Sequence, residues 1–286
     1  MRYLVSAPVS ALLLAAIALV LPGPMPTALA QTDDEPVSQC LAIAQSLPRV
    51  MFASATASPL ATDAHGDVTI TFAGHSTYRI ETPAGVTIAT DFSGVYGHTP
   101  TPRVITMNRA HSTHFTLNPD PEIEVVLPGW DSVDPRGADH DVVVDDVYVR
   151  NVTTDIRRWN TSGLSANQNS IFIFETAGLC IGHLGHLHHR LTEDHFAQIG
   201  RLDVLMVPVD GGLTMAHDGM AEITTRLRSS IVLPMHLRGN SVNRFIALMG
   251  EEWAVDFLDG DTITINVRAL PERPTIMVPA SLARRG

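Results

Sequence analysis

Three short segments of this 286-residue chain carry histidines directly after an apolar run, and this pattern constrains the fold more than any other feature. The segments are RAHSTH at 109–114, IGHLGHLHH at 181–189 and PMH at 234–236. Each preceding run is short enough to be a buried strand, so the sequence predicts imidazoles carried on rigid strand ends. Imidazole is the commonest metal-binding side chain. Since adjacent strand ends lie side by side, we predict that the three segments converge on one metal centre. The alternative is that the histidines lie apart on surface loops.

The remaining pattern predicts hairpins first and β-α-β alternation later. Alternating apolar residues predict a strand at 68–72, with two further strands paired to it by tight turns. A helix is predicted at 192–200, followed by buried strands at 204–209 and 231–235. Residues 157–168 are polar and turn-rich, which predicts a loop over the site. This order predicts an α/β (α+β) fold built as a layered sandwich.

The first thirty residues have the three parts of a secretory signal peptide. Arg2 supplies a weak positive charge, the apolar stretch ALLLAAIALV spans 11–20, and Ala28-Leu29-Ala30 forms a small-x-small cleavage site. A membrane anchor is the alternative, but a span needs roughly twenty apolar residues and this stretch has about ten. We therefore predict a signal peptide over residues 1–30 and a periplasmic or secreted mature chain.

The mature chain is long enough for one large domain. We predict an N-terminal helix and linker at 31–66, the domain at 67–268, and a loose tail at 269–286, which is rich in proline and arginine. The formal net charge of the whole chain is −11. An acidic surface argues against a nucleic-acid or anionic-membrane partner, so a small-molecule substrate or ligand is expected.

The two cysteines, Cys40 and Cys180, lie far apart in the sequence. An oxidising compartment would permit a disulfide between them, which would tie the mature N-terminus to the central sheet. Two unpaired buried thiols are the alternative, and the sequence does not decide between them. No C-x-x-C pair is present, which excludes a structural zinc ribbon.

Several of these segments together resemble a known family. GHSTYRIET at 74–82, followed by Thr90-Asp91, resembles the opening hairpin of the metallo-β-lactamase superfamily. The similarity is to its ascorbate-phosphate lactonase-like and N-acyl-phosphatidylethanolamine phospholipase D-like branch. Further matches in the family's order are NSIFIFE at 169–175, LTED at 191–194, DVLMVPVDGG at 203–212 and IVLPMH at 231–236. The resemblance implies a four-layer αββα sandwich with a metal site at one rim of the two sheets.

The resemblance is incomplete at the metal-binding positions. The family's loop reads H-x-H-x-D-H, and the matching positions here are Arg109, His111, Thr113 and His114. Where the family has a Gly-Asp pair whose carboxylate bridges two metals, this chain has a glycine followed by a histidine. The resemblance therefore implies these metal ligands: His111, His114 and His236, with His186 in place of the bridging carboxylate. His183, three residues before His186, is a further candidate from its spacing alone.

These replacements favour one zinc ion over a dinuclear centre. Two Zn²⁺ ions held close together repel each other unless an anion bridges them. A neutral imidazole cannot bridge, and Arg109 adds positive charge. Three histidines and a water suit hydrolytic Zn²⁺, whereas four histidines would favour a structural or transport role. Thr113 cannot take a proton at neutral pH, so the catalytic base is unknown.

Three residues are expected to orient the ligands from behind: His75, Asp91 and His189. His75 and Asp91 match family positions near the site. The alternative for His75 is a buried, hydrogen-bonded turn residue.

We therefore expect an exported hydrolase with one zinc ion that acts on an ester, lactone or phosphodiester. The alternative is a non-catalytic relative that binds a metal or small ligand, or that serves as an interaction protein, because a fold does not settle a function. The two hypotheses differ in metal behaviour: a zinc hydrolase loses its activity to chelators and recovers it when zinc is restored.

Overall fold

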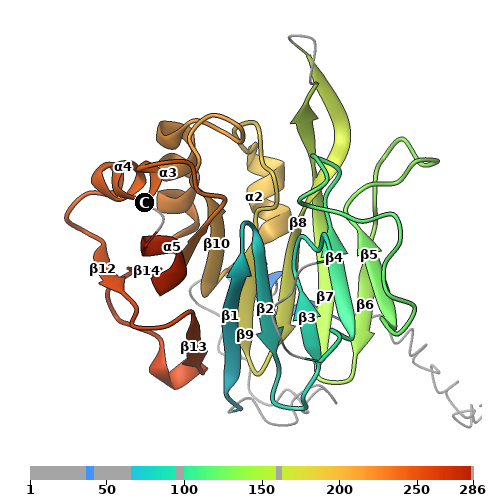
Figure 1. Ribbon diagram of the computed structural model, residues 1–286, viewed down its shortest axis with the longest axis horizontal. Helices are drawn as coiled ribbons and strands as arrows, with labels where there is room; N and C mark the ends of the chain where they lie inside the picture. The colour runs from blue at the N-terminus through green and yellow to red at the C-terminus, as the bar shows by residue number, and fades with distance from the viewer. Residues whose placement is uncertain (1–36, 42–65, 95–99, 159–162, 285–286) are drawn as a thin grey trace, which may run out of the picture. The chain divides into compact units, whose positions relative to one another are not determined.

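The computed structural model describes residues 37–41, 66–94, 100–158 and 163–284, and its strands form two sheets (Figure 1). The first sheet has the order β13 (Thr262–Ile265), β1 (Val68–Gly74), β2 (Thr77–Glu81), β3 (Thr87–Ala89), β4 (Val104–Met107) and β5 (Val125–Pro128). The second has the order β12 (Ala254–Phe257), β14 (Thr275–Val278), β11 (Ile231–Met235), β10 (Val204–Pro208), β9 (Leu179–His183), β8 (Leu164–Thr176), β7 (Val147–Arg157) and β6 (Asp141–Val144).

The described helices include α2 (Glu193–Ile199), α3 (His217–Leu227), α4 (Ser241–Met249), α5 (Ala280–Ala283) and the 3-10 helix η1 (Val267–Ala269). Within the described ranges, no helix combines the length and apolar character that crossing a bilayer would require. The predicted signal peptide, and most of the predicted N-terminal helix and linker, lie outside the described residues.

Alternation explains the first sheet, and continuous apolar runs explain the core of the second. In β1, Val68, Ile70 and Phe72 are buried while the residues between them are half-buried, as a strand with one covered face requires. β10 and β11 are buried along their whole length and pair in parallel, as expected for strands covered on both faces. Apolar side chains of both sheets form one core. The predicted α/β sandwich class is therefore confirmed.

The C-terminal segment is not a loose tail. β14 lies between β12 and β11 and pairs in parallel with both strands. Ile276 and Val278 on it are fully buried. Pro274 and Pro279 flank the strand and do not interrupt it. The prediction of a loose tail over 269–286 is wrong because burial of a short apolar strand outweighs the proline-rich composition around it.

The predicted loop over 157–168 is largely the end of a hairpin. β7 runs to Arg157 and β8 begins at Leu164, and the two residues are paired. Figure 1 shows this hairpin extending beyond the other strands of its sheet. Backbone hydrogen bonds between the two strands satisfy the polar groups of the main chain, whatever the side chains are. A polar composition alone therefore misidentified the segment as a loop.

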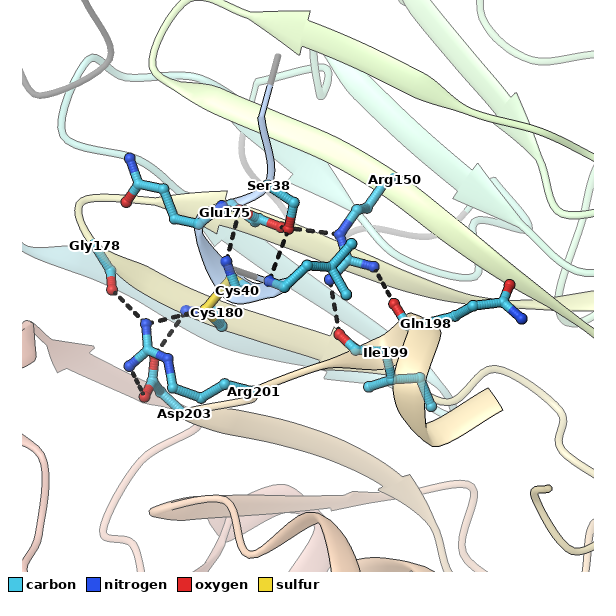
Figure 2. The surroundings of a disulfide bond; sticks show 12 residues. Ser38, Cys40, Arg150, Glu175, Gly178, Cys180, Gln198, Ile199, Arg201 and Asp203 are labelled. Atoms are coloured by element: carbon cyan, nitrogen blue, oxygen red, sulfur yellow. Dashed lines mark hydrogen bonds and ion pairs between the residues drawn. A yellow bond between two sulfur atoms is a disulfide. The ribbon is translucent and has the colours of Figure 1, made fainter. Parts of the chain in front are cut away.

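Cys40 and Cys180 form a disulfide that ties the short described N-terminal segment to β9 (Figure 2). Glu175 on β8 accepts a hydrogen bond from the Ser38 hydroxyl at 2.6 Å. Arg150 Nε on β7 donates to the same carboxylate at 2.9 Å. The structure therefore has the disulfide and not the two unpaired thiols. The buried ion pair of Arg150 and Glu175 also holds the segment that carries Cys40, through the hydrogen bond from Ser38.

Candidate metal centre

The turn between β1 and β2 is fastened to the strand ends of the second sheet by hydrogen bonds. The backbone N–H of His236, which follows β11, donates to the carbonyl of His75 at 2.7 Å. His183 Nε2, at the end of β9, lies 2.8 Å from the carbonyl oxygen of Ser76. The Tyr78 hydroxyl donates to a β11 carbonyl at 2.8 Å. These contacts hold one rim of the first sheet against the carboxyl ends of the parallel strands, the usual place for a site in such sheets.

Four histidines meet at this rim. One ring nitrogen from each lies within 4.8 Å of the others: His75, His111, His114 and His236. Nε2 of His114 and Nε2 of His236 are 3.1 Å apart. Two nitrogens that each bind a tetrahedral Zn²⁺ at about 2.0–2.1 Å are separated by about 3.3 Å, so this spacing fits two ligands of one ion. The donor set therefore fits a divalent metal.

Three of the four rings are held by a partner at the Nδ1 nitrogen. The partners of His114, His236 and His111 are, in that order, Asp91 Oδ2 at 2.7 Å, Asp210 Oδ2 at 2.9 Å and Thr113 Oγ1 at 2.7 Å. A partner that accepts the Nδ1–H leaves the lone pair on Nε2, which is the tautomer that a ligand needs. Because the two carboxylates can only accept, His114 and His236 offer Nε2 lone pairs to the cluster. The Thr113 hydroxyl can likewise accept the Nδ1–H of His111, which leaves Nε2 of that ring free.

Both carboxylates behind the rings are ionised. Burial alone would raise the pKa of Asp91, but the His114 imidazole and a hydrogen bond from Asn108 Nδ2 at 2.8 Å lower it to about 2. Burial opposes ionisation of Asp210 as well, yet the His236 imidazole, 2.9 Å away, and the hydrogen bond from the Thr214 hydroxyl lower its pKa below the usual range. A buried carboxylate that stays charged strengthens the imidazole in front of it as a metal ligand.

The half-buried rings of the cluster are neutral at pH 7. Burial, and then the neighbouring imidazoles, lower the pKa of His75 to about 3 and the pKa of His111 to about 4. The Thr113 hydroxyl bridges the two rings, because it also lies 2.9 Å from His75 Nε2. Metal binding requires neutral imidazoles, so no proton has to be displaced from either ring at neutral pH.

Three residues of the site have left-handed backbone conformations. The φ angles of His75, Asp91 and His236 are 52°, 44° and 54°. Such conformations are uncommon for residues other than glycine and cluster at functional sites, where the surrounding structure maintains them. Two of these residues belong to the histidine cluster, and the third holds His114.

Other sequence candidates lie apart from the cluster. Both ring nitrogens of His183 bond to backbone groups, as do both ring nitrogens of His189, whose partners belong to Asp155 and Arg190. Arg109, at a family ligand position, has an exposed side chain. His183 as a metal ligand and His189 as an orienting residue therefore do not fit this geometry, because backbone groups already occupy their nitrogens.

His186 lies at the edge of the cluster, with Nε2 3.2 Å from His111 Nε2 and Nδ1 2.8 Å from His188 Nε2. His75, which was expected to orient the ligands, is itself one of the four clustered rings. Sequence reasoning assigned no role in the site to Asp210 or to His188. A signal for Asp210 existed, since a carboxylate follows the buried strand β10 within two residues of its end.

A cavity of about 420 Å³ adjoins the cluster. Its lining residues come from the RAHSTH loop, the end of β7, the loop after β9 and the loop after β10: Ala110, His111, Ile156, Arg157, Arg158, His186, His188, Gly212 and Leu213. Among the residues that the structure describes, two arginines and three histidines line the cavity, and no carboxylate does. The site therefore has adjoining space for a substrate.

Residues 69–236, more than half of the chain, match the sequence profile of the beta-lactamase superfamily domain. A comparison with curated proteins found no match. The fold is similar to that of a candidate Zn-dependent hydrolase of the metallo-β-lactamase superfamily from Thermotoga maritima, with a TM-score of 0.51, 24% identity and coverage of 74% of this chain and 97% of that chain. It is also similar to a candidate metal-dependent hydrolase from Parabacteroides distasonis, with a TM-score of 0.50, 15% identity and coverage of 64% and 89%. At these identities the structural matches establish a shared fold, and the lactonase-like and phospholipase-like branch stays a prediction.

Proposed function

Since the chain belongs to the metallo-β-lactamase superfamily, we propose that it is a metal-dependent hydrolase whose ion is held by His111, His114 and His236, with His75 beside them. One observation carries the proposal: these three rings come from two different sheets, and each has its Nδ1 occupied and its Nε2 available. Histidines on unrelated surface loops have no reason to share that arrangement.

We propose zinc as the ion and an ester, lactone or phosphodiester as the substrate. Zn²⁺ held by three histidines supplies Lewis acidity, which lowers the pKa of water to about 7 and polarises a carbonyl or phosphoryl oxygen. The chain's own contribution is to hold the ligands: Asp91 and Asp210 fix the rings of His114 and His236. Their negative charge also offsets part of the charge of a cation.

A single ion is proposed because the group that bridges His75 and His111 is a hydroxyl. Thr113 Oγ1 lies 2.9 Å and 2.7 Å from nitrogens of the two rings. A carboxylate in this position could hold a second cation, whereas a neutral hydroxyl supplies no charge to offset two ions close together. Thr113 positions both rings and accepts no proton at neutral pH.

Export to the periplasm or the exterior is part of the proposal. The signal-peptide pattern of residues 1–30 supports it, as does the disulfide between Cys40 and Cys180. Disulfides persist in oxidising compartments and are rare in the cytosol. Mass spectrometry of the chain secreted from its host tests this, since the mature N-terminus should be Gln31.

Metal content and chelator response test the function. The purified chain should bind about one zinc per molecule, lose hydrolysis of ester, lactone or phosphodiester substrates in chelator, and regain it when zinc returns. His111→Ala should lower zinc affinity at least about tenfold, since even residues behind a ligand are worth 10–100-fold. His140→Ala is the matched control, because His140 Nε2 bonds to the carbonyl of Pro128 away from the cluster.

Two other outcomes would change the conclusion. A chain that binds no zinc and is equally stable in chelator is not a metal-dependent hydrolase. A chain that binds zinc through these histidines but hydrolyses none of the three substrate classes is the non-catalytic metal-binding relative.

A further inference from the structure

Backbone groups on both sides of His188 fix its tautomer. The backbone N–H of Arg157, at the end of β7, donates to His188 Nδ1 at 2.5 Å. On the other side of the ring, Nε2 lies 2.9 Å from the carbonyl oxygen of Leu213. Because a backbone N–H can only donate and a carbonyl can only accept, the neutral ring carries its hydrogen on Nε2.

This tautomer determines that of His186. Nδ1 of His186 lies 2.8 Å from His188 Nε2, which carries a hydrogen, so Nδ1 must accept. A neutral imidazole with a lone pair on Nδ1 carries its hydrogen on Nε2. Both rings are neutral, because an imidazolium has a hydrogen on each nitrogen and could not accept a hydrogen bond at Nδ1, as both of these rings do.

The arrangement opposes a role for His186 as a metal ligand through Nε2. That role would need the hydrogen on Nδ1, where it would point at the N–H of His188 across 2.8 Å. Relieving this clash would require His188 to give up one of its backbone partners. The backbone around His188 is also held in place by hydrogen bonds, because the guanidinium of Arg157 donates to the carbonyls of Gly212 and Thr214, on either side of Leu213.

The Nε2–H of His186 therefore faces the cluster as a donor. In the structure it lies 3.2 Å from Nε2 of His111. Once His111 uses that lone pair for a metal, the donor has no acceptor among its described contacts. The side chain is buried, with 3% of the residue exposed, and a buried N–H without an acceptor is unfavourable. An acceptor brought by a substrate would satisfy it.

The adjoining cavity suits an anionic acceptor. His186 and His111 both line it, together with Arg157 and Arg158, and none of its lining residues in the described ranges is an aspartate or glutamate. The chain as a whole carries a net charge of −11, so a cavity with two arginines differs in charge from most of the protein. A positive, carboxylate-free cavity attracts anions, and an N–H donor strengthens when its acceptor is charged.

We propose that His186 donates its Nε2–H to an anionic oxygen of the substrate, a phosphoryl or carboxylate group bound in this cavity, and does not ligate the metal. His188 is the positioning residue that fixes the tautomer of His186. The inference rests on the proposed function and deepens it, since it assigns an anionic group to the substrate. It also assigns substrate binding, and not metal binding, to the position at which the family has its bridging carboxylate.

The tautomers can be measured directly in the wild-type chain. Long-range ¹H–¹⁵N correlation spectra of the ¹⁵N-histidine-labelled protein, with and without zinc, distinguish protonated from unprotonated ring nitrogens. We expect Nε2–H on both His186 and His188 in both states. A His186 ring with its hydrogen on Nδ1 in the zinc-loaded protein would overturn the proposal, and this measurement needs no variant to fold.

Variants then separate metal binding from anion binding. His186→Ala should keep one zinc per chain with affinity within about threefold of wild type, and should weaken binding of inorganic phosphate or acetate 10–100-fold, as expected for one hydrogen bond to a charged group. His188→Ala should weaken anion binding in the same direction. His189→Ala is the matched control, since both ring nitrogens of this neighbouring histidine hydrogen-bond to backbone groups; the variant should leave both affinities unchanged.

The outcomes distinguish this inference from the proposed function. Titrations with phosphate and with acetate show which anionic group the cavity prefers. Wild-type protein that binds neither anion, or a His186→Ala variant that loses its zinc, overturns the role of His186 while leaving a metal-dependent hydrolase intact. Wild-type protein that binds no zinc rejects the proposed function, and the tautomer and anion measurements on the metal-free chain still decide the role of His186.

Discussion

Replacing Asp91 with asparagine tests whether the carboxylate behind His114 organises the metal centre. Asp91 is fully buried and contacts two donors, His114 Nδ1 at 2.7 Å and Asn108 Nδ2 at 2.8 Å. Asparagine has the same shape but offers only one oxygen. In Asp91→Asn, either His114 or Asn108 must therefore face an NH₂ group. One buried donor then keeps only its longer contact, to the Ser76 hydroxyl at 3.1 Å or to the Ser170 carbonyl at 3.3 Å.

The pKa of Asp91 sets the expected magnitude. It falls from an ordinary value of 3.8 to about 2 in the folded chain. At 1.36 kcal/mol for each pH unit, this difference is worth about 2.5 kcal/mol of folding free energy. Because the folded pKa is lowered, this contribution is present in full above about pH 4 and is lost as the pH falls toward 2. Zinc affinity should also fall, by about 10–100-fold, because Asp91 orients a ligand.

Two measurements on the same variant check these figures. Urea unfolding of the metal-free protein at pH 7 gives the loss of stability, and competition with a chelator of known affinity gives the zinc dissociation constant. Asp218→Asn is the control, because Asp218 has an exposed side chain in the first turn of α3 and a surface contact with Arg190; it should change stability by less than about 1 kcal/mol. If Asp91→Asn leaves zinc affinity within twofold of wild type, Asp91 does not organise the centre.

Three further predictions concern stability. Cys40→Ser should lower the free energy of unfolding by about 2–5 kcal/mol, measured in urea without reductant; reductant should then weaken the wild type and leave the variant unchanged. Tyr78→Phe should lower it by about 1 kcal/mol, because the buried hydroxyl loses its bond to a β11 carbonyl; an unchanged urea midpoint would contradict this. The metal-free wild type should lose stability as the pH falls from 6.5 toward 4. His75 and His111 have folded pKa values of about 3 and 4, so the unfolded chain takes up protons first. Urea midpoints at pH 7.5, 6 and 5 check the sign, and His111→Ala should flatten the dependence.

The strand ends that carry the histidines could be predicted from the sequence. β4 and β11 are short, fully buried runs, and His111, His114 and His236 follow them closely. That these two strands lie in different sheets could not be read from the pattern. Adjacent strands of one sheet would have explained a shared site, whereas the observed site depends on how the two sheets pack at their rim.

The distinction between His183 and His186 was also beyond the sequence. The two residues are three apart and follow the same strand, so spacing treats them alike. His183 Nε2 bonds to Ser76, 107 residues away in the chain, and this contact takes it out of the cluster. The tautomer of His186 depends on Arg157 and Leu213 through His188. Such partners are known only when the chain has folded.

By itself, the sequence determined the buried strands next to the site and which of them end in imidazoles, because apolar periodicity and residue type are local properties of the chain. Only the tertiary structure decided which ring nitrogen has a free lone pair and which carries a hydrogen. His114 and His236 meet across 122 residues of sequence, at 3.1 Å. Hydrogen-bond direction depends on the nearest donor or acceptor in space, and at this site those groups come from both sheets and from the loops between their strands.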